Sequence, residues 1–153
     1  MLTKEQKKIW LDWADTLEFG NLKQTRGHLC AASINGDKVN ASYCCLGVLC
    51  AMHNAATAPK ENNWQWRSPV IVRHGIRSPK EEAGYAVAYL GSESMPPTSV
   101  QIWAGLDPSI AGTFATLNDG CYLSFKRIAH RIREYVRSGS TRDLYSWRDL
   151  YSC

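Results

Sequence analysis

Arginine, tryptophan and glycine residues in two segments have the chemistry to bind a phosphorylated ligand with an aromatic base. A guanidinium group holds a phosphate through two parallel hydrogen bonds, and a base that stacks on an aromatic ring gains about 1–3 kcal/mol. Glycine lets a backbone amide approach an anion closely because it has no side chain. The candidate ligand-binding residues of these segments are Gln24, Arg26, Gly27, Trp64, Trp66, Arg67 and Arg73. The alternative is that a tryptophan lies in the core and that the arginines are solvated.

Two adjacent polar residues, Asn118 and Asp119, supply a different kind of group. Amide and carboxylate oxygens accept hydrogen bonds from the hydroxyls of a ribose, so both residues are candidates for ligand binding. The competing interpretation is a turn, because Asn and Asp favour turns and Gly120 follows them directly. Such a turn would lead into a helix capped by Ser124. The sequence leaves both interpretations open.

Cysteines are the remaining candidates for chemistry, and they are Cys30, Cys44, Cys45, Cys50, Cys121 and Cys153. Cys44 and Cys45 begin a predicted helix, where the pKa of a thiol is lowered, and a thiolate beside a histidine is a nucleophile. They also lie in the run 44–52, which is apolar on every side, and burial would keep them unreactive. Cys50 and His53 share a helix face, but a zinc ion needs two further ligands. We therefore expect buried structural thiols, with no metal and no cofactor.

Motifs of known enzymes are missing from the sequence. There is no GxSxG, HExxH, Walker loop or paired-carboxylate signature, and no histidine falls in a recognisable motif. No residue is assigned a catalytic role for this reason. The sequence favours a protein that binds over one that catalyses a reaction.

The length and composition are those of one globular domain. A chain of 153 residues buries about 68–70% of the surface that it exposes when unfolded, and 44% hydrophobic with 21% charged residues is ordinary. No run approaches the roughly 18 apolar residues of a membrane span. The N-terminus is charged and lacks the apolar core of a signal peptide. We therefore expect no membrane association, a cytoplasmic location and reduced thiols.

The residue patterns predict a single α+β domain over residues 1–137, with a small antiparallel sheet packed against about four to five helices. Thr3 and Gln6 match a capping box, and Asn35-Gly36 favours a tight hairpin turn. Helices are predicted at 3–18, 44–55, 98–104 and 124–137, and strands at 28–34, 38–43, 70–73 and 85–90. Loops are predicted at 56–68 and 75–84. Residues 138–153 are predicted to be a tail or a short docked helix.

The net charge of +4 is concentrated in the last part of the chain, after residue 120. The predicted helix over 125–137 has one apolar face and one basic face. A basic face attracts anionic partners such as nucleic acid or an acidic protein. Without a DNA-binding motif, its binding to nucleic acid would be non-specific. The alternative is a solvated helix face with no partner.

Four motifs follow one another at residues 24–29 (QTRGHL), 43–50 (YCCLGVLC), 95–106 (MPPTSVQIWAGL) and 117–129 (LNDG, then SFKRIA). Together they resemble a family of small tailed-phage and prophage proteins with the pattern Q-x-R-G-x-L, Y-C-C-L-G-V-L, L-P-x-x-V-x-x-W-x-G-L and L-N-D-S-G-x-S-F-x-x-I-A. The chain departs from this pattern where Pro96-Pro97 replaces Leu-Pro and where Gly120-Cys121 replaces Ser-Gly. Its final helix is also more basic than that of its relatives.

The resemblance implies a phage protein that acts in the cytoplasm of a bacterial host. Small accessory phage proteins often counter host defences, and one such mechanism is the sponge, which binds and hides a nucleotide-derived immune signal without cleaving it. We therefore expect a sponge for a small anionic nucleotide-like ligand. The second hypothesis is an inhibitor that binds a host protein or nucleic acid through the basic helix, and the third is a small hydrolase. A homo-oligomer is compatible with all three.

Overall fold

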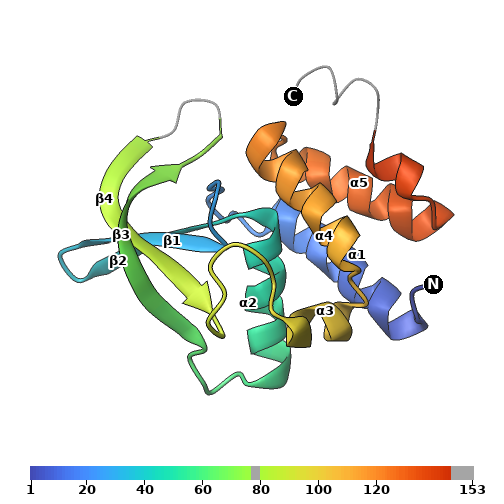
Figure 1. Ribbon diagram of the computed structural model, residues 1–153, viewed down its shortest axis with the longest axis horizontal. Helices are drawn as coiled ribbons and strands as arrows, with labels where there is room; N and C mark the ends of the chain where they lie inside the picture. Colours follow the sequence, from blue (N-terminus) through green and yellow to red (C-terminus); the bar gives the residue numbers. More distant parts are fainter. Residues whose placement is uncertain (77–79, 146–153) are drawn as a thin grey trace.

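The computed structural model describes residues 1–76 and 80–145, and it places a curled sheet beside a group of helices (Figure 1). The first half of the chain contains α1 (Lys4–Phe19), β1 (Cys30–Asn35), β2 (Lys38–Tyr43), α2 (Cys45–Thr57), β3 (Trp64–His74) and β4 (Lys80–Tyr89). The second half contains α3 (Thr98–Ala104), α4 (Pro108–Ala115), the π-helical turn η1 (Thr116–Gly120), α5 (Phe125–Ser138) and the 3-10 turn η2 (Thr141–Leu144). The predicted single α+β domain is confirmed. Within the two described ranges, no helix is both long and apolar enough to cross a membrane.

The helices begin where the sequence supplies caps. The Thr3 side chain accepts a hydrogen bond from the Gln6 amide (3.1 Å), and the Gln6 side chain accepts one from the Thr3 amide (3.0 Å). Ser124 caps α5 in the same way, and Cys44 caps α2 with its sulfur. All four predicted helices are confirmed to within two residues. Helix α4 was not predicted, although Asp107 caps it and Pro108 occupies its first turn.

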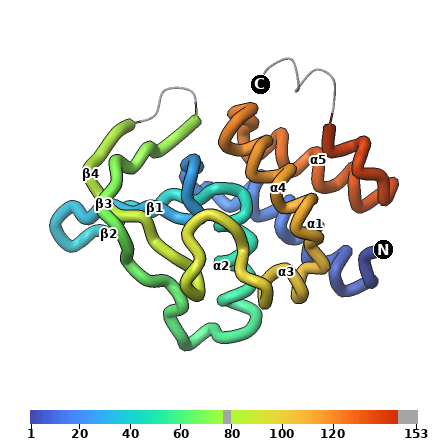
Figure 2. Tube along the Cα trace, viewed as in Figure 1, coloured from blue at the N-terminus to red at the C-terminus, as the bar shows by residue number. Residues whose placement is uncertain are grey.

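The sheet is antiparallel with the strand order β2-β1-β4-β3, and the predicted hairpin between β1 and β2 is confirmed. Residues 23–25 connect its two edge strands at one end. The Thr25 amide donates to the Tyr43 carbonyl of β2 (2.9 Å), and the Gly75 amide, directly after β3, donates to the Gln24 carbonyl (2.7 Å). These bonds hold residues 23–25 between the β3–β4 hairpin and the helices, as the trace in Figure 2 shows.

Strands β3 and β4 are longer than the sequence indicated. The loop predicted at 56–68 is wrong from Trp64 onward, where β3 begins. The loop predicted at 75–84 is wrong from Lys80 onward, where β4 begins. β3 is an edge strand whose first residues are mostly exposed, so it accommodates polar side chains that are typical of a loop. Pro69 lies where the register between β3 and β4 shifts, which is a position that tolerates proline. Residues 77–79 lie outside the described residues.

The core lies between the helices and the adjoining end of the sheet. Trp10 and Trp13 of α1 are fully buried. Their indole nitrogens donate to the carbonyls of Ala104 (2.7 Å) and Cys45 (2.9 Å), which ties α1 to α3 and α2. At Gly47 an added Cβ would lie 1.7 Å from the Leu29 carbonyl oxygen. Only glycine therefore allows α2 to pack this closely against the chain that leads into β1.

The C-terminal part of the described chain packs onto α1. Arg133 of α5 donates to Asp15 (2.7 Å) and also to Glu18. Leu144 of η2 is 1% exposed and belongs to the core, so the segment after α5 is docked at its beginning. The rest of the helix predicted in this tail, from residue 146 onward, lies outside the described residues.

Candidate functional site

Four of the candidate ligand-binding residues line one cavity of about 350 Å³, although they are far apart in the sequence. They are Arg26, Gly27, Arg73 and Asp119, and the other lining residues are Thr25, His28 and Ile71. The segment 25–28 supplies one wall, β3 supplies another, and η1 supplies the third. We call this cavity the Arg26 pocket. It combines guanidinium groups, an open glycine and a carboxylate.

Arg26 is held in place on one side only. Its guanidinium carbon lies 4.3 Å from the centroid of the Tyr122 ring, which is a cation–π contact. Its Nε is buried and has no hydrogen-bond partner. Among the buried side-chain nitrogens and oxygens of the described residues, it is the atom without one. A buried donor without a partner costs about 1–3 kcal/mol. An anion in the pocket would interact with the charge of this guanidinium group, while the buried Nε itself is not exposed to the cavity.

Arg73 of β3 also lines the pocket and has a partner. Its Nε lies 2.9 Å from Oε1 of Glu81, and both side chains are about half exposed. Exposed ion pairs of this kind contribute only about 0–1 kcal/mol. Arg73 can therefore turn toward an anionic ligand at little cost.

The glycine of the pocket leaves room for a ligand. Gly27 has a φ of 79°, which disfavours any residue with a side chain. No atom lies within 4 Å of the position where its Cβ would be. Gly27 thus lines the pocket with no neighbouring atom over its Cα.

Gln24 and Asn118 lie behind the pocket, and their amides are used within the protein. Gln24 Nε2 donates to Asn118 Oδ1 and to the Leu123 carbonyl (both 2.8 Å), and Gln24 Oε1 accepts from the Phe125 amide (3.0 Å). Asn118, which is fully buried, donates to the Thr25 carbonyl (2.9 Å). The structure thus gives these two residues a positioning role, because they connect the segment that carries Arg26 to the turn η1 that carries Asp119.

Trp64 and Trp66 line a different cavity of about 290 Å³, beside Tyr43, Asn62 and Val87. This cavity shares no lining residue with the Arg26 pocket. Arg67 lines neither one, and it donates weakly to Gln65 (3.4 Å). The predicted ligand-binding residues are therefore divided between two cavities. The cavity that Arg26 and Arg73 line is the one that suits an anion.

A buried polar cluster that the sequence analysis missed lies inside the curled sheet. His74 Nδ1 contacts the Ser42 hydroxyl, and His74 Nε2 lies 3.2 Å from Glu82 Oε2. Hydrogen bonds from Ser33 and Lys80 lower the pKa of Glu82 to about 2. The order serine, histidine and carboxylate resembles a hydrolase triad, but Ser42 is 0% exposed. The cluster therefore stabilises the sheet and presents no nucleophile to a substrate.

The cysteines of α2 and β1 are unreactive for the reason that the apolar run predicts. Burial raises the pKa of Cys30 and of Cys44 to about 12, and it also raises that of Cys45. The expectation of a lowered thiol pKa at the start of α2 is wrong. Desolvation raises the pKa there by more than the helix N-terminus lowers it. Cys121 is disulfide-bonded, so the expectation of reduced thiols is wrong at this position. In the described part of the chain, no group of three or more His, Cys, Asp or Glu residues is arranged to hold a metal ion.

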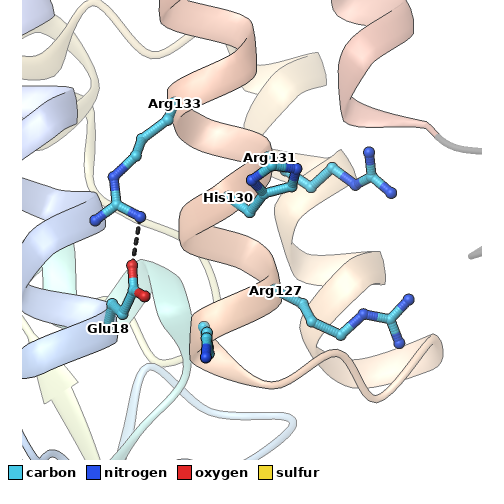
Figure 3. A pocket seen from close by; sticks show the side chains of 6 residues that line it. Glu18, Arg127, His130, Arg131 and Arg133 are labelled. Atoms are coloured by element: carbon cyan, nitrogen blue, oxygen red, sulfur yellow. Dashed lines mark hydrogen bonds and ion pairs between the residues drawn. The ribbon is translucent and has the colours of Figure 1, made fainter.

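The basic face of α5 forms a second candidate site of about 300 Å³ (Figure 3). Its lining residues are Glu18, Lys126, Arg127, His130, Arg131 and Arg133. Figure 3 shows that Arg133 points toward Glu18 of α1, whereas Arg127 and Arg131 point away from it. Arg131 also pairs with Glu134 (3.2 Å). Part of the positive charge of this helix is therefore used to hold the fold together.

Comparison with known proteins identifies a family and no activity. A family model described as "Domain of unknown function (DUF8296)" matches residues 5–136, which include the whole Arg26 pocket. Searches of curated proteins and of solved structures found no match.

Proposed function

The chain belongs to the DUF8296 family, a domain of unknown function, and we propose that it binds and sequesters a small anionic nucleotide-derived ligand in the Arg26 pocket. In this proposal it is a phage accessory protein that acts as a sponge for a host immune signal in the bacterial cytoplasm. The motifs described above support the phage setting. The pocket supports the kind of ligand.

The single observation that carries the proposal is that Arg26, whose buried Nε has no hydrogen-bond partner, and Arg73 line the same cavity. Two arginines around one cavity match a phosphate group, which has several acceptor oxygens.

The way in which the pocket is built also favours binding. Its Arg26 wall is fixed by backbone hydrogen bonds of residues 24 and 25 to β2 and to the chain after β3. A site that is rigid before the ligand arrives loses less conformational entropy on binding. The volume of about 350 Å³ is at the small end of ligand sites, which suits one nucleotide unit.

The proposal is tested by purifying the protein from bacteria that produce a nucleotide-based defence signal, heating it, and analysing the supernatant by mass spectrometry. Wild-type protein should release an intact nucleotide-derived molecule. Arg26→Gln and Arg73→Gln should retain roughly ten- to a hundredfold less, since a charge-assisted contact contributes about 1.5–3 kcal/mol. Arg67→Gln is the matched control and should retain the wild-type amount. A cleaved product, or no captured molecule at all, would contradict the sponge.

The second candidate function is an inhibitor that binds a host protein or nucleic acid through the basic face of α5. Lys126 and His130 are exposed on this face, and they support contact with an anionic surface. Arg133 supports it less, because two carboxylates of α1 already neutralise its charge. The Arg26 pocket has the better-defined geometry, so the sponge remains our first proposal.

A further inference from the structure

Asp119 is an unexpected residue in a pocket built for an anion. Its carboxylate faces the cavity that Arg26 and Arg73 line, and a carboxylate repels a phosphate. It is not a counter-ion for these arginines, since in the described residues Arg73 pairs with Glu81 and no ion pair within 4.0 Å joins Asp119 to Arg26. A site for phosphate alone would have no use for this side chain.

The carboxylate is also held in one orientation. Asn118 Nδ2 donates to Asp119 Oδ1 (2.7 Å), and Asn118 itself is fixed by the carbonyl of Thr25 (2.9 Å) and the amide of Cys45 (3.2 Å). Because Asn118 is fully buried, it cannot turn to another partner. The network therefore aims one carboxylate at the pocket and leaves its second oxygen as an acceptor.

From this geometry we infer that Asp119 recognises the ribose of the ligand, so that the pocket selects a ribonucleotide over the corresponding deoxyribonucleotide and over phosphate alone. Ribose hydroxyls donate hydrogen bonds, and a carboxylate only accepts them. The phosphate lies between Arg26 and Arg73, and Asp119 accepts from the 2′-hydroxyl on the third wall. This inference deepens the proposed function and rests on it.

The balance of charges in the pocket supports the same kind of ligand. A compact polyphosphate would bring several negative charges close to Asp119, whereas a single phosphate next to a neutral sugar keeps them apart. The pocket of about 350 Å³ has room for one sugar and one phosphate. A carboxylate and arginines on separate walls thus match a ligand that presents hydroxyls on one side and a phosphate on the other.

The experiment measures the Kd of three probes by calorimetry: adenosine 5′-monophosphate, 2′-deoxyadenosine 5′-monophosphate and inorganic phosphate. Wild-type protein should bind the ribonucleotide roughly ten- to a hundredfold more tightly than the deoxyribonucleotide, because a hydrogen bond to a charged group is lost. Asp119→Asn keeps the size of the side chain and an acceptor for Asn118. It should reduce the preference to less than about threefold and should bind phosphate at least as well as wild type. Asp37→Asn removes the same charge at an exposed turn and should leave the Kd of all three probes unchanged.

The outcomes separate the inference from the function on which it rests. If wild-type protein binds both nucleotides equally and Arg26→Gln weakens both, the ribose assignment is wrong and the anion pocket stands. If Asp119→Asn keeps the full ribose preference and an unchanged melting temperature, another residue recognises the sugar and the inference fails. If none of the three probes binds to the wild-type protein, the pocket is not a nucleotide site, and the proposed function fails with it.

Discussion

At the scale of single residues, the buried amides of Gln24 and Asn118 show how side chains with ordinary chemistry position those at a site. Both residues looked like ligand contacts in the sequence, because amides suit nucleotides. In the structure they join residues 24–25 and the turn η1, which lie next to or within two walls of the Arg26 pocket, to the start of α2. Their types were identifiable from the sequence, but their partners were not, since these partners lie 73 or more residues away.

Replacing Asn118 with alanine should therefore destabilise the protein strongly. The change leaves the Cys45 amide and one of the two amide hydrogens of Gln24 Nε2 without an acceptor, and each buried unsatisfied group costs about 1–3 kcal/mol. We expect the melting temperature to fall by roughly 4–12 °C, measured by circular dichroism. Asn62→Ala, at an exposed position, should lower it by no more than about 2 °C. Equal melting temperatures for the two variants would mean that the network does not stabilise the fold.

Glu82 should make the stability of the sheet depend on pH. Hydrogen bonds from Ser33 and Lys80 lower its pKa from 4.5 to about 2 in the folded protein. The folded state thus favours the ionised form, so this stabilisation is complete above pH 4.5 and is lost as the pH falls from 4.5 toward 2. Thermal unfolding of wild type and of Glu82→Gln should differ most near pH 6, and the difference should shrink steadily as the pH falls toward 2. A difference that stays constant between these pH values would contradict the assignment.

At the scale of the elements, helices were predictable and the long hairpin was not. The caps Thr3 and Ser124 are local signals, and they placed α1 and α5 to within two residues. β3 has no such signal, because an edge strand with exposed polar residues and Pro69 has the composition of a loop. Ile71 and Arg73, which form one wall of the Arg26 pocket, lie on this strand. The meeting of Arg26 with Arg73 could not be predicted, because it depends on how the sheet curls.

Replacement by alanine should have opposite effects on stability at two helical glycines. At Gly47 an added Cβ would lie 1.7 Å from the Leu29 carbonyl oxygen, so Gly47→Ala should force α2 away from the sheet and lower the melting temperature. At Gly112 of α4 no atom lies within 4 Å, so Gly112→Ala should stabilise the protein by about 0.5–1 kcal/mol through helix propensity. Chemical denaturation measures both. A destabilised Gly112→Ala variant would contradict this account of α4.

At the scale of the whole molecule, the two candidate binding surfaces are separate. The Arg26 pocket lies between the β3 wall and η1, whereas the basic face belongs to α5 and its neighbour α1, and the two share no lining residue. This separation means that a ligand and a polyanionic partner need not compete for the same side chains. It also allows the two candidate functions to be tested independently in one protein.

The last prediction is that substitutions on one surface impair binding at that surface and leave binding at the other surface unchanged. Lys126→Gln combined with Arg127→Gln removes two exposed charges of the basic face that do not line the Arg26 pocket. Any affinity for duplex DNA should fall, and the slope of log K against log salt should become about 2 units shallower, because each phosphate contact contributes about 0.9. Capture of the nucleotide-derived ligand should be unchanged. Arg26→Gln should do the reverse, with ligand capture lost and DNA binding and its salt slope nearly kept. If the α5 variant loses capture while its melting temperature is unchanged, the ligand site lies on α5 and the Arg26 pocket is not the functional one.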